Sequence, residues 1–204
     1  MESRPRKLTL SRRSFLAFSV AASLPLAARD RSALSNRRRA LEHGPLTPYI
    51  GPARATRVLA MYMDYHCPFC RAMDPLLPKL TARNPGLQIE YKELPVLRWD
   101  SQVAARIALV AQKHGRFRQA HERLFQERGD FTGASATRIA ESLGLDPQAF
   151  RLQMGSPAVS AELAKNFRDA DALGIEATPG LVTLRTLVQG ALDLQQLQAL
   201  VNTV

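Results

Sequence analysis

The pattern of hydrophobic positions predicts a strand, a helix and a second strand in the first half of the folded domain. Residues 57–63 form an apolar, β-favouring run, and residues 87–93 alternate between apolar and polar positions. Between them, residues 71–83 have helical spacing, with one apolar side made of Met73, Leu76, Leu77 and Leu80. Pro75 is expected to kink this helix, and Pro78 to shorten it. The order predicts one βαβ unit with a right-handed crossover.

Helical periodicity dominates the middle of the chain. Capping residues, glycines and prolines divide residues 101–174 into five predicted helices. These helices begin at Ser101, Arg116, Thr137, Asp146 and Ser156, and Ser101 is the expected cap of the first. Their apolar faces predict a small bundle that lies over one end of the sheet.

β structure returns near the C-terminus. Residues 181–184 and 187–189 are short apolar runs joined by a tight link, and Gly190 ends the second run. Asp193 and Gln196 then form a capping pattern for a final helix. A βαβ half and a ββα half separated by helices predict an α/β protein, a thioredoxin fold with an inserted helical domain.

The predicted domain covers residues 44–204, with the helical insertion at about residues 100–173. It begins with residues 43–52, which are rich in glycine and proline and predict an irregular lead-in. Tyr49 and Ile50 in this lead-in are expected to pack against the sheet. The length is suited to one domain with a sizeable core.

The net charge of +10 is not spread evenly along the chain. Residues 1–40 contain ten lysines or arginines against two acidic residues, so the rest of the chain carries only +2. A phosphate-binding face on the folded domain therefore has little support, and we expect no nucleic-acid partner.

The basic start of the chain has the layout of an export signal. Arg12 and Arg13 precede a moderately apolar run, residues 15–28, that is too short and too polar to span a membrane. This layout resembles a twin-arginine signal, whose arginines are read by a receptor. We expect residues 1–43 to be an export signal and basic linker, and the protein to be periplasmic or otherwise exported. A disordered basic arm on a cytoplasmic protein is the alternative.

Both cysteines of the chain lie where the first predicted strand meets the following helix. Residues 64–70, with the sequence DYHCPFC, hold them with two residues between, which is typical of a thioredoxin-like redox motif. Cys67 is expected at the helix N-cap, where backbone N–H groups and the helix dipole lower its pKa. Cys67 is therefore the expected nucleophile, and Cys70 is the expected resolving thiol.

Several segments together resemble the DsbA family of thiol:disulfide oxidoreductases. They are residues 64–70, Glu93-Leu94-Pro95-Val96-Leu97, Ala104-Ala105-Arg106, Leu173-Gly174-Ile175, Thr178-Pro179 and the closing Gly190. The resemblance covers about residues 44–204. It implies that the active cysteine attacks a partner's thiol or disulfide and forms a mixed disulfide.

The resemblance also implies roles for residues around the two cysteines. Cys67 and Cys70 take the redox roles, and Pro179 is a cis-proline that holds an extended substrate, with Thr178 offering backbone hydrogen bonds. The other residues expected to contact the substrate are His66, Pro68 and Phe69. Its partners would be substrate proteins with cysteine thiols and, for recycling, a quinone-linked membrane protein. No cofactor and no resident metal is expected.

The chain departs from strongly oxidising members at Phe69, where they have a histidine whose charge stabilises the thiolate. We therefore expect Cys67 to be less acidic and the pair less oxidising. His66 is a candidate to compensate from outside the loop, and a partly exposed histidine without a role is the alternative.

Other polar and aromatic residues have two interpretations each. Glu90 and Glu93 are candidates for a buried acid that moves protons to Cys70, and solvated strand-end carboxylates are the alternative. Trp99 either lines the substrate groove or packs in the core. His121 has no convincing set of metal-ligand partners, so a solvated helix face is expected.

Three classes of function remain open at this point. The first is an exported enzyme that oxidises protein cysteines, with reduction or isomerisation as variants of the same chemistry. The second is a small-molecule enzyme similar to the kappa-class glutathione transferases, which do not depend on a redox cysteine pair. The third is a metal carrier that binds Cu(I) or half of a zinc site through both thiolates. Because nothing resembles the separate dimerisation domain of isomerases of this group, we favour a monomeric oxidase.

Overall fold

The computed structural model describes residues 26–203, which contain a five-stranded sheet in the order β1-β3-β2-β4-β5. The strands are β1 (Tyr49–Ile50), β2 (Arg57–Met63), β3 (Leu87–Glu93), β4 (Gly180–Val182) and β5 (Leu187–Gln189). β2 and β3 are parallel, whereas the pairs β1–β3, β2–β4 and β4–β5 are antiparallel. The predicted βαβ and ββα halves are therefore both present in one sheet.

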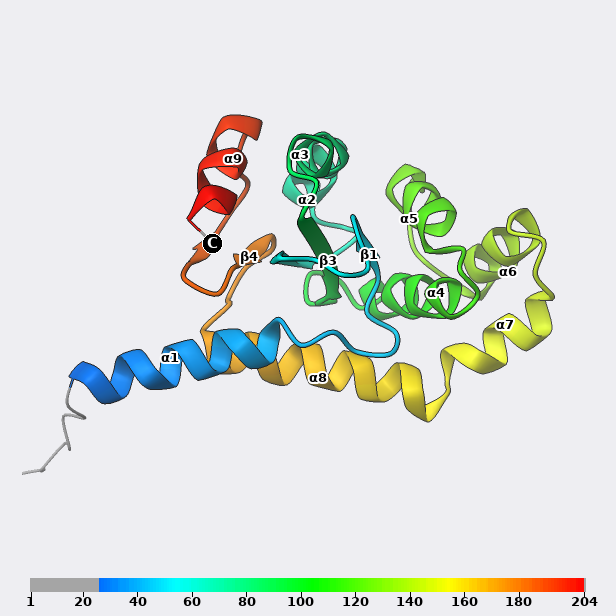
Figure 1. Ribbon diagram of the computed structural model, residues 1–204. Helices are drawn as coiled ribbons and strands as arrows, with labels where there is room; N and C mark the ends of the chain where they lie inside the picture. The colour runs from blue at the N-terminus through cyan, green and yellow to red at the C-terminus, as the bar shows by residue number, and fades with distance from the viewer. Residues whose placement is uncertain (1–25, 204) are drawn as a thin grey trace, which may run out of the picture.

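Helices cover both faces of this sheet. They are α1 (Leu26–Ala40), α2 (Pro68–Met73), the 3₁₀ helix η1 (Asp74–Leu76), α3 (Leu77–Arg83), α4 (Ser101–Lys113), α5 (Phe117–Gln126), α6 (Gly133–Ser142), α7 (Pro147–Met154), α8 (Pro157–Leu173) and α9 (Leu194–Asn202). Figure 1 shows α3 and α9 on one side of the sheet, α1 and α8 along the other, and α4 to α7 grouped at one end. This arrangement confirms the predicted α/β layers with a helical insertion. None of the helices within residues 26–203 is long and apolar enough to cross a lipid bilayer.

The sheet separates two hydrophobic cores because side chains on a strand alternate between its faces. Met61 and Met63 of β2 face the larger core, together with apolar residues of α2, α3, α4 and α9. Ala60 and Tyr62 of the same strand face the smaller core, which α1 and α8 close. We call the side of the larger core the redox face, because it also contains both cysteines.

The helix that follows the cysteine motif is broken as its prolines predict. Residues 68–83 divide into α2, η1 and α3, and Pro75 and Pro78 lie in the first turns of η1 and α3. Proline is accepted there because the first N–H groups of a helix have no intrahelical partner. The kink turns the chain without exposing the apolar residues Met73, Leu77 and Leu80, which remain buried.

Two local expectations were wrong. Tyr49 and Ile50 form strand β1 and pair with Glu90 and Ile89 of β3, instead of belonging to an irregular segment. Ser101 does not cap α4, since Asp100 occupies the N-cap position and makes no side-chain cap hydrogen bond. In both cases contacts with distant parts of the chain replace the local pattern.

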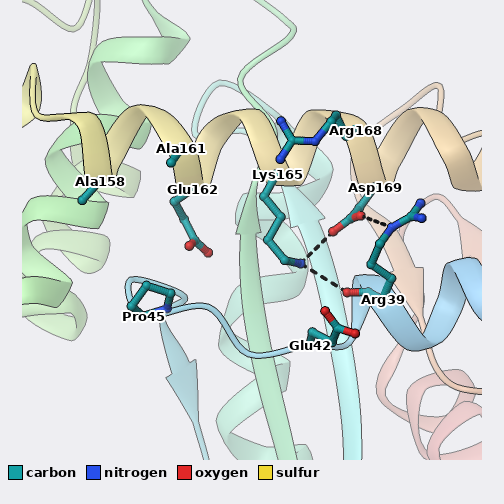
Figure 2. A pocket seen from close by; sticks show the side chains of 9 residues that line it. All are labelled: Arg39, Glu42, Pro45, Ala158, Ala161, Glu162, Lys165, Arg168 and Asp169. Carbon is teal, nitrogen blue, oxygen red and sulfur yellow. Dashed lines mark hydrogen bonds and ion pairs between the residues drawn. The ribbon is translucent and has the colours of Figure 1, made fainter.

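Helix α1 packs along α8, although its residues lie in the segment expected to be an export signal and basic linker. Arg39 Nε and Lys165 Nζ both reach the buried carboxylate of Asp169, at 2.9 and 2.7 Å. Figure 2 shows these three side chains at one end of a cavity of about 610 Å³ between α8 and the segment after α1. The paired Arg12 and Arg13 lie outside the described residues.

Candidate active site

Cys67 occupies the N-cap of α2. Its backbone is extended, and the Cys70 N–H donates a hydrogen bond to the Cys67 sulfur at 3.3 Å. Pro68 follows at the first helical position, where its fixed φ favours the start of a helix. The motif therefore starts the helix and places its first sulfur against unpaired N–H groups, as predicted from the sequence.

The surroundings of Cys67 favour its thiolate. They lower the pKa of Cys67 from its ordinary value to about 6, mainly because the Cys70 thiol stabilises the Cys67 thiolate. Burial has the second-largest effect and opposes this shift, whereas contacts with Thr178 and with the backbone N–H groups of Cys70 and Phe69 lower the pKa further by smaller amounts. His66 is not among the groups that lower this pKa. The first cysteine is thus acidic with Phe69, and no histidine, between the two cysteines.

Cys70 has the opposite character. It is fully buried, and the pKa of its thiol lies well above the ordinary value. The larger cause is its hydrogen bond to the Cys67 sulfur, which needs the Cys70 proton, and the second cause is burial. Both cysteines are free thiols in this structure. A thiolate at Cys67 beside a protonated Cys70 gives the pair one nucleophile and one reserve thiol.

The segment that leads into β4 lies against Cys67. The Thr178–Pro179 peptide bond is cis, as expected, and Pro179 is buried. The Cys67 sulfur lies 3.2 Å from the carbonyl oxygen of Thr178 and donates a hydrogen bond to it when it is protonated. Thr178 Oγ1 is buried and has no hydrogen-bond partner within residues 26–203. Two distant segments of the chain, 111 residues apart, are therefore in contact at the reactive sulfur.

Asp64 fixes the loop that holds Cys67, and the sequence analysis did not identify it. One carboxylate oxygen accepts hydrogen bonds from the His66 N–H at 2.8 Å and the Ser101 hydroxyl at 3.0 Å. The other accepts from the N–H groups of Val96 and Leu97, both at 2.9 Å. A single buried side chain thus joins the cysteine loop, the loop after β3 and the start of α4. We call these four hydrogen bonds the Asp64 clamp.

His66 is directed toward the helical insertion. Its Nε2 lies 3.0 Å from both carboxylate oxygens of Asp100, which also accepts a hydrogen bond from the Phe131 N–H. The hydrogen bonds from Phe131 and His66 lower the pKa of Asp100 despite its burial. The contacts of His66 therefore connect the cysteine loop to two segments of the insertion.

Exposed apolar side chains lie beside the buried cysteines. They are Phe69, Val96, Leu97 and Trp99, with exposed fractions of 62%, 49%, 49% and 73%, and we call them the apolar rim. Trp99 is not a core residue, so that interpretation was wrong. Cys67 itself is only 2% exposed, so a partner has to contact the residues around it to reach the sulfur.

The two candidate glutamates lie on opposite faces of the sheet, and both are buried. Glu90 pairs with the buried Lys92 at 2.8 Å on the side of α8, away from the redox face. Glu93 shares the redox face with Tyr91, and burial raises its pKa well above the ordinary value. Only Glu93 therefore remains a candidate for proton exchange with Cys70.

His121 is buried, so the expectation of a solvated face was wrong. It is 4% exposed and lies among Tyr65, Tyr91, Phe117 and Phe125. Within the described part of the chain, no three His, Cys, Asp or Glu side chains gather closely enough to hold a metal ion.

The acidity of Cys67 leads to a direct test. We expect the rate of alkylation of the reduced protein by iodoacetamide to rise with pH through a midpoint near 6, because only the thiolate reacts and the pKa of Cys67 is lowered to about 6. Mass spectrometry counts the modified cysteines, and Cys70 should remain unmodified. The urea-unfolded protein is the control, with a midpoint near the ordinary value of about 8.5. The same high midpoint in the folded protein would contradict the assignment.

Comparison with solved structures supports the fold. The chain is similar to a thioredoxin-like oxidoreductase from Silicibacter pomeroyi, with 31% identity, a TM-score of 0.75, and coverage of 81% of this chain and 96% of that chain. It is equally similar to the catalytic domain of Proteus mirabilis ScsC, with 31% identity, a TM-score of 0.74, and coverage of 85% and 97%. A periplasmic thioredoxin-like protein from Salmonella enterica is 28% identical, with a TM-score of 0.71 and coverage of 82% and 94%.

Comparison with curated proteins gives a partial match of another kind. The Na(+)/H(+) antiporter NhaA 1 of Salinispora arenicola is 26% identical over 197 residues, which cover 93% of this chain but only 30% of that protein. The chain therefore spans less than a third of the length of this relative. Residues 58–202, which include the cysteine motif and the cis-proline, match the DSBA-like thioredoxin domain. The predicted family is confirmed: the chain belongs to the DsbA-like thioredoxin domain family.

Proposed function

We propose that the protein is an exported thiol:disulfide oxidoreductase that exchanges disulfides with cysteines of substrate proteins, and that it acts as an oxidase. The observation that carries this proposal is the contrast within the pair. Cys67 has a pKa of about 6, whereas Cys70 is buried and remains protonated. Because of this contrast, Cys67 can act as the attacked sulfur or as the leaving group, while Cys70 stays protonated until it is needed to resolve a mixed disulfide.

In the proposed oxidation, the pair starts as a Cys67–Cys70 disulfide. A substrate thiolate attacks the Cys67 sulfur, a mixed disulfide forms, and Cys70 leaves as a thiolate that takes up a proton. A second substrate thiolate then attacks the substrate sulfur of the mixed disulfide, and Cys67 leaves as a thiolate. The substrate loses two electrons and gains a disulfide, and the pair gains two electrons. A quinone-linked membrane protein is the proposed acceptor that restores the disulfide.

The substrate is proposed to bind as an extended segment across Pro179 and the apolar rim. Thr178 lies against the Cys67 sulfur, and Pro179 follows it just before β4 begins, so the backbone of an extended substrate can form hydrogen bonds with this segment. Pro68 and Phe69 are exposed directly beside the buried sulfur. Apolar side chains flanking the substrate cysteine would be removed from water by this rim.

Oxidation is favoured over reduction because the thiolate of Cys67 stabilises the reduced form of the pair. A pair whose reduced form is stabilised gives up its disulfide readily and is a stronger oxidant. The acidity of Cys67 comes from Cys70, Thr178 and backbone groups, so it does not require a histidine at the position of Phe69.

The reduction potential of the pair tests this proposal. We expect the purified protein, equilibrated with glutathione buffers, to have a potential less negative than about −200 mV, closer to the value of about −120 mV for DsbA than to about −270 mV for thioredoxin. A value near that of thioredoxin would reverse the proposed direction and make the protein a reductant. Failure to form the intramolecular disulfide would overturn the redox function and favour the metal carrier.

Export and a monomeric state are part of the proposal. The layout of residues 1–28 resembles a twin-arginine signal, and a similar solved structure is that of a periplasmic protein. An oxidising compartment also suits the chemistry, because substrate disulfides persist there.

A further inference from the structure

A chain of buried polar side chains runs from β3 to the surface on the redox face. The Tyr65 hydroxyl lies 3.3 Å from Glu93 Oε1 and 2.7 Å from His121 Nδ1. His121 Nε2 in turn lies 2.9 Å from Asp74 Oδ1. Glu93, Tyr65 and His121 are each less than 5% exposed, whereas the Asp74 side chain is 22% exposed. This row of polar side chains therefore has one end, Glu93, inside the protein and the other end, Asp74, at the solvent.

The inner end of this chain lies on the same side of the sheet as Cys70. Glu93 pairs with Met63 across the parallel strands, and Met63 belongs to the core cluster that contains Cys70. Asp64 acts on both groups, because its backbone opposes the rise in the pKa of Cys70 and its carboxylate charge raises the pKa of Glu93. The second carboxylate oxygen of Glu93 is buried and has no hydrogen-bond partner in the described part of the chain. This oxygen is free to exchange a proton.

Tyr65 has a single hydroxyl proton but two neighbours at hydrogen-bonding distance, which limits how protons can be arranged. When Glu93 is protonated, it donates to Tyr65, Tyr65 donates to His121 Nδ1, and the His121 Nε2–H donates to Asp74. When Glu93 is ionised, Tyr65 donates to Glu93, and His121 carries a proton on both nitrogens. The two arrangements differ by the transfer of one proton from Glu93 to His121 through Tyr65.

We propose that Tyr65 and His121 carry protons between Glu93 and solvent at Asp74, so that Glu93 can take up the proton of Cys70 and return it. This inference rests on the proposed exchange reaction. Before Cys70 attacks a mixed disulfide, Glu93 passes its proton to Tyr65, and Tyr65 passes its own to His121. Glu93 then accepts the Cys70 proton, the Cys70 thiolate bonds to the Cys67 sulfur, and the partner leaves as a thiolate. One proton in total moves from Cys70 to the Asp74 end.

Polar and charged groups outside this row of hydrogen-bonded side chains also act on it. Tyr91 donates a hydrogen bond to the same Asp74 oxygen at 3.3 Å and has its ring against His121. Arg118 and Glu122 line the small opening at the Asp74 end, and Asp64 acts on Glu93 at the inner end. Asp74 accepts a hydrogen bond from His121 Nε2 in both proton arrangements, so it forms the outer end of the path.

The test compares two buried tyrosines: Tyr65 lies between Glu93 and His121, whereas Tyr91 donates to Asp74 and does not contact Glu93. Reduced protein is mixed with excess oxidised glutathione and quenched with acid, and mass spectrometry gives the lifetime of the protein–glutathione disulfide. For Tyr65→Phe we expect a roughly tenfold longer lifetime near neutral pH, with a changed profile between about pH 5 and about pH 9, because the proton path is cut. Tyr91→Phe also removes a buried hydroxyl, but this hydroxyl does not lie between Glu93 and His121. The lifetime in Tyr91→Phe should therefore match that of the wild type.

A second variant keeps the proposal testable if Tyr65→Phe does not fold. Asp74→Asn lies at the partly exposed end and replaces the carboxylate that accepts from His121 with an amide, which removes the proton acceptor at the end of the path, so the lifetime should lengthen in the same way. Equal lifetimes and equal pH profiles for wild type, Tyr91→Phe and whichever of these variants folds would overturn the proton path while leaving the exchange function intact. If the wild type forms no glutathione disulfide, the proposed function fails and the proton path fails with it.

Discussion

Replacing Cys67 with serine should abolish thiol–disulfide exchange, because Cys67 is the sulfur with a pKa near neutrality and Cys70 is fully buried. A serine hydroxyl is not ionised at neutral pH and forms no disulfide. The measurement is the rate of oxidation of a reduced substrate peptide by the purified protein. Residual turnover above the rate without protein would contradict the assignment of Cys67.

Cys70→Ser is the matched variant and should behave differently. Cys67 keeps its N-cap position, but no second thiol is left to release a bound partner, so mixed disulfides between Cys67 and substrates should accumulate. On non-reducing gels they are detected as bands of higher mass, which disappear when a reductant is added. If Cys70→Ser turns over substrate like the wild type, Cys70 is not the resolving thiol. The metal-carrier alternative makes a different prediction, because there both substitutions weaken metal binding without trapping any protein.

Asp64→Ala should lower the free energy of unfolding by about 3–5 kcal/mol, because each donor left unpaired by the loss of the Asp64 clamp costs about 1–3 kcal/mol where it is buried. The carboxylate accepts four hydrogen bonds from three segments, so its loss also frees the loop that holds Cys67. Exchange activity should fall as well, because the loop after β3 is no longer fixed beside Cys67. Urea unfolding followed by circular dichroism measures the change in stability.

Ser101→Ala is the control for this substitution. It removes one of the four donors and leaves the other three in place, so we expect a loss of about 1–2 kcal/mol. Equal losses in Asp64→Ala and Ser101→Ala would mean that the backbone N–H groups of the clamp find other partners. Asp64 would then be an ordinary buried residue and not the anchor of the cysteine loop.

The redox helix and its strand were predictable because local rules decide them. The spacing of apolar residues indicates β2 and β3, and Pro75 and Pro78 can be accommodated only in the first turn of a helix. The N-cap position of Cys67 follows from Pro68 after it, which favours the first helical position. These features depend on residues within a few positions of one another.

Elements that depend on distant partners were not predictable in the same way. Tyr49 and Ile50 become a strand only because β3 offers an unpaired edge, and the neighbouring glycines and prolines indicate a loop. The basic residues before position 40 indicate a linker, but Asp169 and Lys165 of α8 provide partners that hold α1. Local composition contains no information about these partners.

The buried polar residues were the hardest part of the site to identify. His121 belongs to a helix with many polar residues, and only the aromatic cluster around Tyr65 buries it. Asp64 left one signal that could have been used: an acidic residue directly after the apolar run of residues 58–63 is expensive to bury. Its position three residues before Cys67 therefore indicated that its side chain holds the cysteine loop in place.

The position of Trp99 determines what intrinsic fluorescence can report. It is the single tryptophan of the chain, and its side chain is 73% exposed in the folded protein. Its emission should already resemble that of a solvated indole, so unfolding should shift the spectrum little. A polypeptide segment that lies across the apolar rim would cover the indole and move its emission to shorter wavelengths. The protein thus contains its own optical probe, one that responds to occupancy of the redox site rather than to the folded state.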